Sequence, residues 1–219
     1  MATRLPLFPL NSVLVPGLVL PLHVFEPRYR VLVQALLELP EEAERRFGVI
    51  AIRSGREVGA DGARALHAVG CTAELREVTP YADGRFDLVT VGENRFRLVG
   101  LDEDAGTPYH TGFVDFLPER DGDGDVLSLS RQVTARFAEY RERLGVEVNE
   151  LPEQPQVVSY LVAAAVVLDL PDRQALLEEP TTAERLRAEL ELLRREVALV
   201  GAFRSLPAVE LAGDTGSPT

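Results

Sequence analysis

The hydrophobic and polar positions divide the chain into a strand-rich first half and a helical second half. In the first half, apolar runs of strand length are separated by turn signals such as Pro16-Gly17 and Asp83-Gly84. Gly70 to Val78 alternates apolar and polar side chains, which is typical of a half-buried antiparallel strand. The expected strands cover 5–10, 18–22, 47–52, 70–78, 86–91, 95–101 and 109–117, with a turn at 92–94. Short strands at such close spacing predict a small barrel-like sheet.

One helix is expected among these strands. Pro27 is favoured at the first helical position, and Glu26 before it serves as cap and as partner of the positive helix end. An apolar stripe follows at helical spacing, formed by Tyr29, Leu32, Val33 and Leu36. Pro40 ends the pattern. The stripe predicts that this helix packs on the sheet, and Arg28 is a candidate partner for an acidic neighbour.

From Asp125 onward the spacing becomes helical. Asp125 caps a helix that Gly145 ends, and its stripe consists of Val126, Leu129, Val133, Phe137, Tyr140 and Leu144. Further helices are expected over 156–168 and 172–178. Thr181 and Glu184 form a capping box before a last helix with Leu186, Leu190, Leu193, Val197 and Val200 in its stripe. The sequence therefore predicts an α+β protein with a sheet domain over 1–119, a helical bundle over 125–203 and a flexible tail over 204–219.

Alternating aspartate and glycine from Asp121 to Asp125 mark the join between the two halves. Glycines and like charges favour an exposed linker. The same three aspartates also resemble the start of a calcium loop. Such a loop needs a bidentate glutamate at its twelfth position, where this chain has Gln132. We therefore expect a solvated linker and no metal.

The charge composition excludes several kinds of chemistry. The formal net charge is −12, and a field of that sign repels nucleic-acid phosphates, so we expect no nucleic-acid partner. All 23 basic residues are arginine, because the chain contains no lysine. P-loop nucleotide binding, Ser-Lys peptidases and Schiff-base enzymes all require a lysine. A triad assembled from distant residues stays possible, because triads are geometric.

The remaining reactive side chains are few and scattered. Cys71 is the only cysteine and falls on the apolar face of its strand, which indicates packing rather than reactivity. The histidines, His23, His67 and His110, match no metal-ligand spacing and are interpreted as isolated. We expect no catalytic residue and no cofactor. One cysteine, no signal pattern and no membrane-length apolar run lead us to expect a cytoplasmic protein without a membrane partner.

The unusual apolar feature surrounds the Pro-Gly turn near the N-terminus, where polar residues are normally found. It comprises Leu14, Val15, Leu18, Val19, Leu20 and Leu22. Two interpretations stay open. The run forms two buried strands, or part of it lines an apolar groove, since contiguous exposed apolar patches mark binding sites.

Several segments in order resemble the N-terminal domain of Lon proteases. The opening segments are RLPLFPL (4–10), VLVPG (13–17) and LPLHVFEPRY (20–29); the later ones are FGVI (47–50), GCTAEL (70–75), GENRFRL (92–98), RQALLE (173–178) and ERL (184–186). The resemblance extends from about Arg4 to Ala202. Val15 departs from it, because an aromatic residue is common at that position in the family.

The resemblance implies a PUA-like pseudo-barrel followed by a helical bundle, and a role in recognising unfolded or tagged protein substrates. It does not carry over catalysis, because the ATPase and peptidase of the full protease lie in later domains; we expect a stand-alone, non-catalytic form. Our hypothesis is a peptide-binding or adaptor module, with a protease as one candidate partner. Its groove residues are Leu14, Val15, Leu18, Val19 and Phe25. The alternatives are a PUA-like RNA-binding protein and an unrecognised hydrolase; the oligomeric state stays open.

Overall fold

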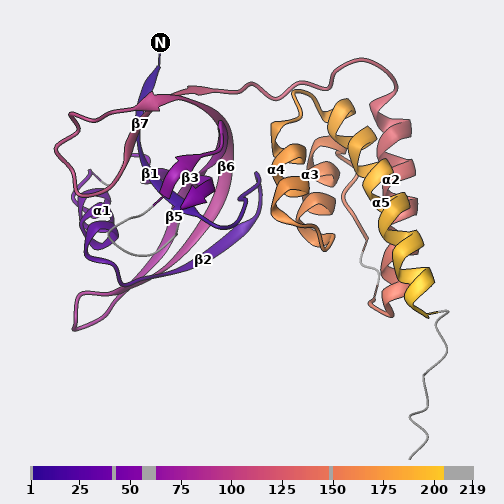
Figure 1. Cartoon of the computed structure of the whole chain (residues 1–219), viewed down its shortest axis with the longest axis horizontal. Coiled ribbons are helices and arrows are strands. Elements are labelled where there is room, and N and C mark those ends of the chain that lie inside the picture. Colours follow the sequence, from indigo (N-terminus) through magenta and orange to yellow (C-terminus); the bar gives the residue numbers. More distant parts are fainter. Residues whose placement is uncertain (1, 41–42, 56–62, 148–149, 205–219) are drawn as a thin grey trace, which may run out of the picture.

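All the strands and the helix Pro27–Leu37 lie in one half of the molecule, and the other helices lie in the other half (Figure 1). The computed structural model describes residues 2–40, 43–55, 63–147 and 150–204. The strands are β1 (Thr3–Leu10), β2 (Val19–Val24), β3 (Arg46–Gly55), β4 (Ala63–Leu66), β5 (Val69–Pro80), β6 (Phe86–Leu101) and β7 (Thr111–Phe116). The helices are α1 (Pro27–Leu37), α2 (Val126–Leu144), α3 (Pro155–Ala165), α4 (Leu170–Glu178) and α5 (Thr182–Arg204). The predicted α+β class is confirmed.

The sheet closes on itself through its first strand. The strand order is β1-β7-β6-β5-β3-β4, and β1 also pairs with β3 in parallel register, with Leu7 opposite Gly48. Five strands thus form a ring, and β2 pairs with β6 outside that path. Strands within a closed ring have no free edge. In the described part of the chain, the open edges therefore fall on β2 and β4.

β6 is one continuous strand, so the turn predicted at 92–94 is wrong. The Gly92 N–H donates to the Leu18 carbonyl at 2.9 Å, and the Gly17 N–H donates to the Gly92 carbonyl at 2.8 Å. A Cβ atom on Gly92 would lie 2.2 Å from the Val15 carbonyl oxygen. The glycine therefore serves close approach of two backbones and not a turn. The register with β5 shifts near this point. β6 pairs with β2 before Gly92 and with β7 after it.

The predicted helix α1 is confirmed, and it lies against the strands on the side away from the other helices (Figure 1). It begins at Pro27, and the predicted stripe is buried. The Tyr29 ring stacks on Phe8 with their centroids 4.0 Å apart. Glu26 occupies the cap position without a side-chain cap bond; its carboxylate pairs instead with Arg28 at 3.1 Å. The strand β4 was not predicted, since that segment follows a glycine-rich loop.

The helical half has the caps that the sequence predicts. The Asp125 carboxylate accepts the Ser128 N–H at 2.9 Å, and Gly145 ends α2 in the left-handed conformation with φ 71°. The Thr181 hydroxyl accepts the Glu184 N–H at 3.2 Å at the start of α5. α2, α3 and α5 share a core that contains Val133, Phe137, Tyr140, Val158, Val162, Val166, Leu186, Leu190, Leu193 and Val197.

The Asp121–Asp125 segment is exposed, as predicted, but it is also anchored. The carbonyls of Arg120 and Asp121 accept the N–H groups of Thr182 and Ala183, each at 2.9 Å. The first N–H groups of a helix lack partners within that helix. The segment therefore completes the N-terminus of α5. The division into domains at 119 and 125 stays a prediction, and residues 205–219 of the predicted tail lie outside the described residues.

Replacing Gly92 by alanine should lower the free energy of unfolding by about 1–3 kcal/mol, because the new methyl group meets the Val15 carbonyl. Gly100 lies on the same strand and has open space around its Cα. Gly100→Ala should therefore change stability by less than about 0.5 kcal/mol. Urea unfolding followed by circular dichroism measures both. Equal losses from the two substitutions would contradict the close-approach role of Gly92.

Candidate functional site

A groove of about 180 Å³ lies where β2 leads into α1. We call it the β2 groove; it is lined by Phe8, Leu10, Pro21, Leu22, His23, Val24, Phe25, Glu26 and Tyr29. Its floor includes the stacked rings of Phe8 and Tyr29, which are buried. Its rim includes Phe25, which is 49% exposed. The groove thus combines a fixed apolar floor with an apolar group that reaches into solvent.

The alternating pattern of β2 explains how the groove forms. Leu20 and Leu22 pack against the core that includes the buried face of α1, and Val19 and His23 face solvent. Pro21 has no N–H, which a strand tolerates only at an edge, a strand start or a bulge. Because β2 pairs only with β6 among the described strands, its second edge stays open beside the groove.

A polar cluster connects the groove to the hairpin between β5 and β6. His23 Nδ1 lies 2.6 Å from Asp87 Oδ1, and the Tyr81 hydroxyl donates to the other oxygen of the same carboxylate. The His23 ring lies 6.2 Å from the Phe25 ring and 6.1 Å from the Tyr81 ring. The hydrogen bonds from Tyr81 and His23 lower the pKa of Asp87. The Asp87 carboxylate thus contacts the His23 and Tyr81 side chains, and the Phe25 ring lies beside the His23 ring.

The structure separates the five predicted groove residues. Leu14 and Val15 are only 2% and 5% exposed, so they lie in the core and the prediction that they line an open groove is corrected. Their loop is held against β6 by the bonds at Gly92. Leu18 is half-buried against the same core, and Val19 is 55% exposed. Phe25 is the one predicted residue that lines the β2 groove.

The sequence analysis missed the cluster because His23 looked isolated. Its partner lies 64 positions away, and only the pairing of β2 with β6 places His23 opposite Asp87. Tyr81 belongs to the predicted hairpin, whose Asp83-Gly84 turn is confirmed by the positive φ of Gly84, 79°. The sequence did not show which strand pairs with β2.

The other reactive side chains give less evidence of a functional site. Cys71 is fully buried, and burial raises the pKa of its thiol above the ordinary range. Within the ranges that the structure describes, no three His, Cys, Asp or Glu side chains are grouped to hold a metal ion. No described helix is both long enough and apolar enough to cross a membrane.

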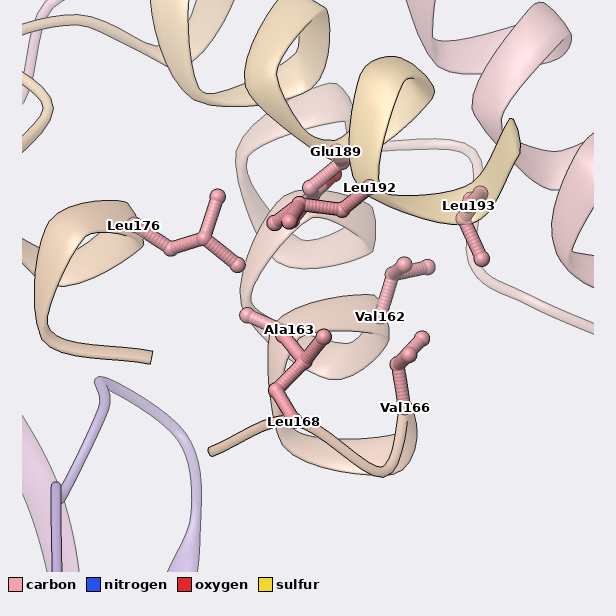
Figure 2. Close-up of a pocket in the computed structure, with 8 residues that line it drawn as sticks. All are labelled: Val162, Ala163, Val166, Leu168, Leu176, Glu189, Leu192 and Leu193. Carbon is pink, nitrogen blue, oxygen red and sulfur yellow. The ribbon is translucent and has the colours of Figure 1, made fainter. Parts of the chain in front are cut away.

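Two further hollows lie in the helical half. One, of about 650 Å³, runs along α2 and is lined by Leu127, Ser130, Arg131, Thr134, Ala135, Ala138, Leu151, Pro152 and Glu153. Its lining is mostly small or polar and contains no aromatic ring. The other is an apolar cavity of about 10 Å³ between α3, α4 and α5. Glu189 is the one charged residue in its lining (Figure 2). That volume holds about one water molecule.

A buried arginine joins the strands to the helices. Arg95 on β6 is 1% exposed; its Nε donates to Glu119 at 2.7 Å, and one of its terminal nitrogens donates to the carbonyls of Leu177 and Glu179 at 2.8 and 2.6 Å. The two carbonyls belong to the C-terminal end of α4, where backbone oxygens lack partners within the helix. Arg95 thus satisfies that helix end from the other half of the molecule.

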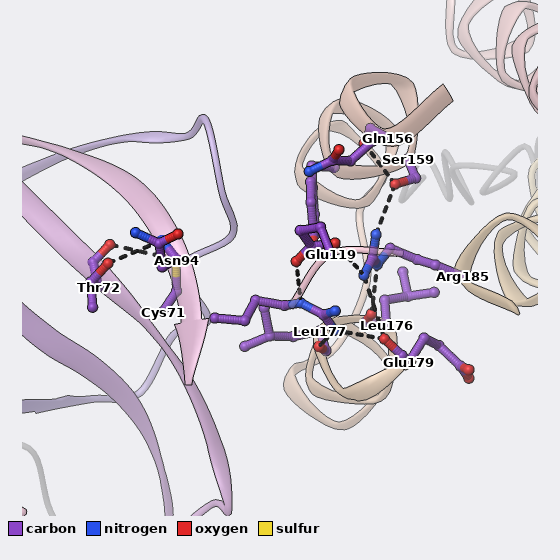
Figure 3. A network of polar contacts seen from close by, with 12 residues as sticks. Cys71, Thr72, Asn94, Glu119, Gln156, Ser159, Leu176, Leu177, Glu179 and Arg185 are labelled. Carbon is purple, nitrogen blue, oxygen red and sulfur yellow. Dashed lines mark hydrogen bonds and ion pairs between the residues drawn. The ribbon is translucent and has the colours of Figure 1, made fainter. Parts of the chain in front are cut away.

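A second arginine binds the same helix end from α5 (Figure 3). Arg185 donates to the Leu176 carbonyl at 3.1 Å and to the Ser159 hydroxyl at 3.1 Å. Its guanidinium lies 4.0 Å from the centre of the Tyr160 ring, and the Tyr160 hydroxyl donates to Glu119 at 2.7 Å. Glu119 therefore pairs with both arginines, with Arg95 at 2.7 Å and with Arg185 at 3.7 Å.

The chain matches the family model of the "ATP-dependent protease La (LON) substrate-binding domain" over residues 4–195. It therefore belongs to this family, as its sequence motifs predicted. Among curated relatives, it is 31% identical to Lon protease 2 of Myxococcus xanthus and 30% identical to the Lon protease of Anaeromyxobacter dehalogenans, each over 88% of this chain. It spans about a quarter of the length of those relatives, 24% and 23% respectively.

Solved structures agree with this assignment. A crystal structure of a Lon N-terminal domain protein from Xanthomonas campestris is 27% identical, covers 88% of this chain and 98% of its own, and has a TM-score of 0.65. The N-terminal domain of a Mycobacterium avium complex Lon protease has the same TM-score and coverage at 18% identity, which shows the fold alone.

Replacing Arg95 by methionine should lower the free energy of unfolding by about 3 kcal/mol, because two helix-end carbonyls and Glu119 lose a charged donor. Arg97 is exposed on the same strand, so Arg97→Met should cost less than about 0.5 kcal/mol. Chemical unfolding of both variants is the measurement. An Arg95→Met protein as stable as the Arg97→Met control would show that the junction is not held as described.

Proposed function

We propose that this chain is a non-catalytic module that binds unfolded or hydrophobic segments of other proteins. The observation that carries the proposal is the β2 groove, with its apolar floor and its half-exposed Phe25 rim. Membership of a substrate-binding domain family supports a recognition role. The proposal adds where the client binds and what kind of client it is.

The size of the groove supports a peptide client over a small molecule. Pockets for small molecules usually measure about 300–1,000 Å³ and enclose most of the ligand. At about 180 Å³, the β2 groove suits individual apolar side chains of a longer chain. Val19 lies along the same strand and is 55% exposed, so it extends the apolar surface beyond the groove. A client that lies along β2 would contact both Phe25 and Val19.

The open edge of β2 adds a second mode of contact. Extended peptides bind exposed strand edges through main-chain hydrogen bonds, with side-chain pockets giving specificity. Pro21 removes one donor from this edge, which limits pairing with another strand. We therefore assign most of the affinity to side chains that enter the groove and a smaller part to the strand edge.

The finer architecture and partners belong to the same proposal. We propose that residues 1–119 form a PUA-like domain and residues 125–203 a helical bundle, and that the module acts as an adaptor for a protease. The closed strand ring supports the first point. Relatives named Lon protease, of which this chain matches about a quarter, support the second. The net charge of −12 favours apolar or cationic clients over nucleic acid.

Replacing Phe25 by aspartate should weaken binding of a fluorescently labelled, permanently unfolded model protein by at least about tenfold, since burial of a phenylalanine ring contributes about 1.5–3 kcal/mol. Fluorescence anisotropy measures the dissociation constant. Val99 is also exposed, at 60%, but lies on β6 outside the groove lining, so Val99→Asp is the matched control. Equal dissociation constants for the two variants would show that the β2 groove does not bind the client.

The purified chain should neither hydrolyse ATP nor cleave casein. Two observations support this expectation: the chain contains no lysine, and its single thiol is buried at Cys71. Phosphate release and peptide release are the readouts, with a catalytically active Lon protease as positive control. Turnover by the pure chain that a point substitution abolishes would overturn the non-catalytic assignment.

A further inference from the structure

Glu189 on α5 is a buried acidic side chain in the helical half. It is 2% exposed, and within the described part of the chain neither of its carboxyl oxygens has a hydrogen-bond partner. The other residues that line its cavity are all apolar: Val162, Ala163, Val166, Leu168, Leu176, Leu192 and Leu193 (Figure 2). An ionised carboxylate in such a setting is costly, so the group is expected to hold its proton.

The electrostatics agree with the geometry. Burial raises the pKa of Glu189 well above the ordinary value, and Arg185 is the one charged group that opposes this shift. The cavity residues from α3 and α4 contribute no titratable group. Arg185 itself faces Tyr160 from α3, Arg95 from β6, and Glu119. The protonation state of Glu189 therefore depends chiefly on its cavity and on one arginine.

Arg185 lies one helical turn before Glu189. Residues four positions apart share a helix face and can form an ion pair. Both are buried on α5, where Arg185 is fully enclosed. In this structure Arg185 donates instead to the Leu176 carbonyl, the Ser159 hydroxyl and, at 3.4 Å, the Glu179 carbonyl (Figure 3). An ionised Glu189 carboxylate, one turn further along α5, would offer this arginine a second acceptor.

We propose that Glu189 and Arg185 form a proton-controlled switch between two arrangements of the helical half. With Glu189 protonated, Arg185 binds the C-terminal end of α4 and lies near Glu119. When Glu189 loses its proton, the guanidinium turns to the Glu189 carboxylate. The carbonyls of Leu176 and Glu179 then lose a donor, which loosens α4 and the junction that Arg95 forms with it.

The sign of the pH effect follows from the raised pKa. The folded state holds the Glu189 proton at pH values where the unfolded chain has already lost it. The stabilisation is complete below the ordinary glutamate pKa of about 4.3, and it falls as pH rises towards the pKa of the folded protein. Over that interval, each pH unit lowers the ratio of folded to unfolded protein about tenfold.

The test is a titration of the full chain by nuclear magnetic resonance. Carbon-13 signals report the glutamate carboxyls, and the nitrogen-15 signal of Arg185 Nε reports its hydrogen bond to Leu176. We expect the Glu189 carboxyl to titrate well above the ordinary glutamate pKa of about 4.3. The Arg185 Nε signal should shift with the Glu189 midpoint.

The variants separate the switch from a general pH effect. Glu189→Gln should abolish the shift of the Arg185 signal and make the urea midpoint less sensitive to pH, whereas Glu191→Gln should leave both as in the wild-type protein. Glu189→Met is a second variant for the same purpose if the glutamine protein folds poorly. A Glu189 carboxyl that titrates at the ordinary glutamate pKa of about 4.3, or an Arg185 signal that does not follow it in the wild-type protein, would overturn the proposal.

Discussion

The rest of the structure depends on the hydrogen bonds that two buried arginines donate to the C-terminal end of α4. Arg95 comes from the strand ring and Arg185 from α5, and both donate to backbone carbonyls at that helix end. Burying a guanidinium is favourable only when its donors find acceptors. The helix end supplies them, because its last carbonyls lack partners within the helix. The strand ring and the helices are thereby held in one arrangement.

The same strand that carries Arg95 also positions the candidate binding surface. β6 pairs with β2 through Val19–Val24, and that pairing places His23 opposite Asp87. The groove floor comes from β1 and α1, through Phe8 and Tyr29. The candidate groove and the attachment of the helices therefore share one long strand, because β6 pairs with β2 and carries Arg95.

Local patterns predicted the elements well. The stripe of α1, the caps Asp125 and Thr181 and the Asp83-Gly84 hairpin follow from short-range chemistry that does not depend on the rest of the fold. The errors arose where distant segments decide the outcome. Gly92 was interpreted as a turn residue, although its role is to admit the Val15 carbonyl.

The candidate site was predicted less completely than the elements. Leu14, Val15 and Phe25 are all apolar. Residue type alone therefore could not show that the first two lie in the core and that Phe25 lies at the rim of the groove. That distinction required the pairing of β2 and the path of the preceding loop across β6. The cluster of His23, Tyr81 and Asp87 likewise exists only through pairing of distant strands. The family motifs indicated recognition as the role but did not locate the surface.

The most direct measurement of the central claim is a map of backbone amide signals during titration with an unfolded client protein. The account predicts that the largest shifts fall on β2, on Phe25 at its end and on the hairpin that carries Tyr81. Shifts confined to the hollow along α2, with β2 unchanged at saturation, would contradict it.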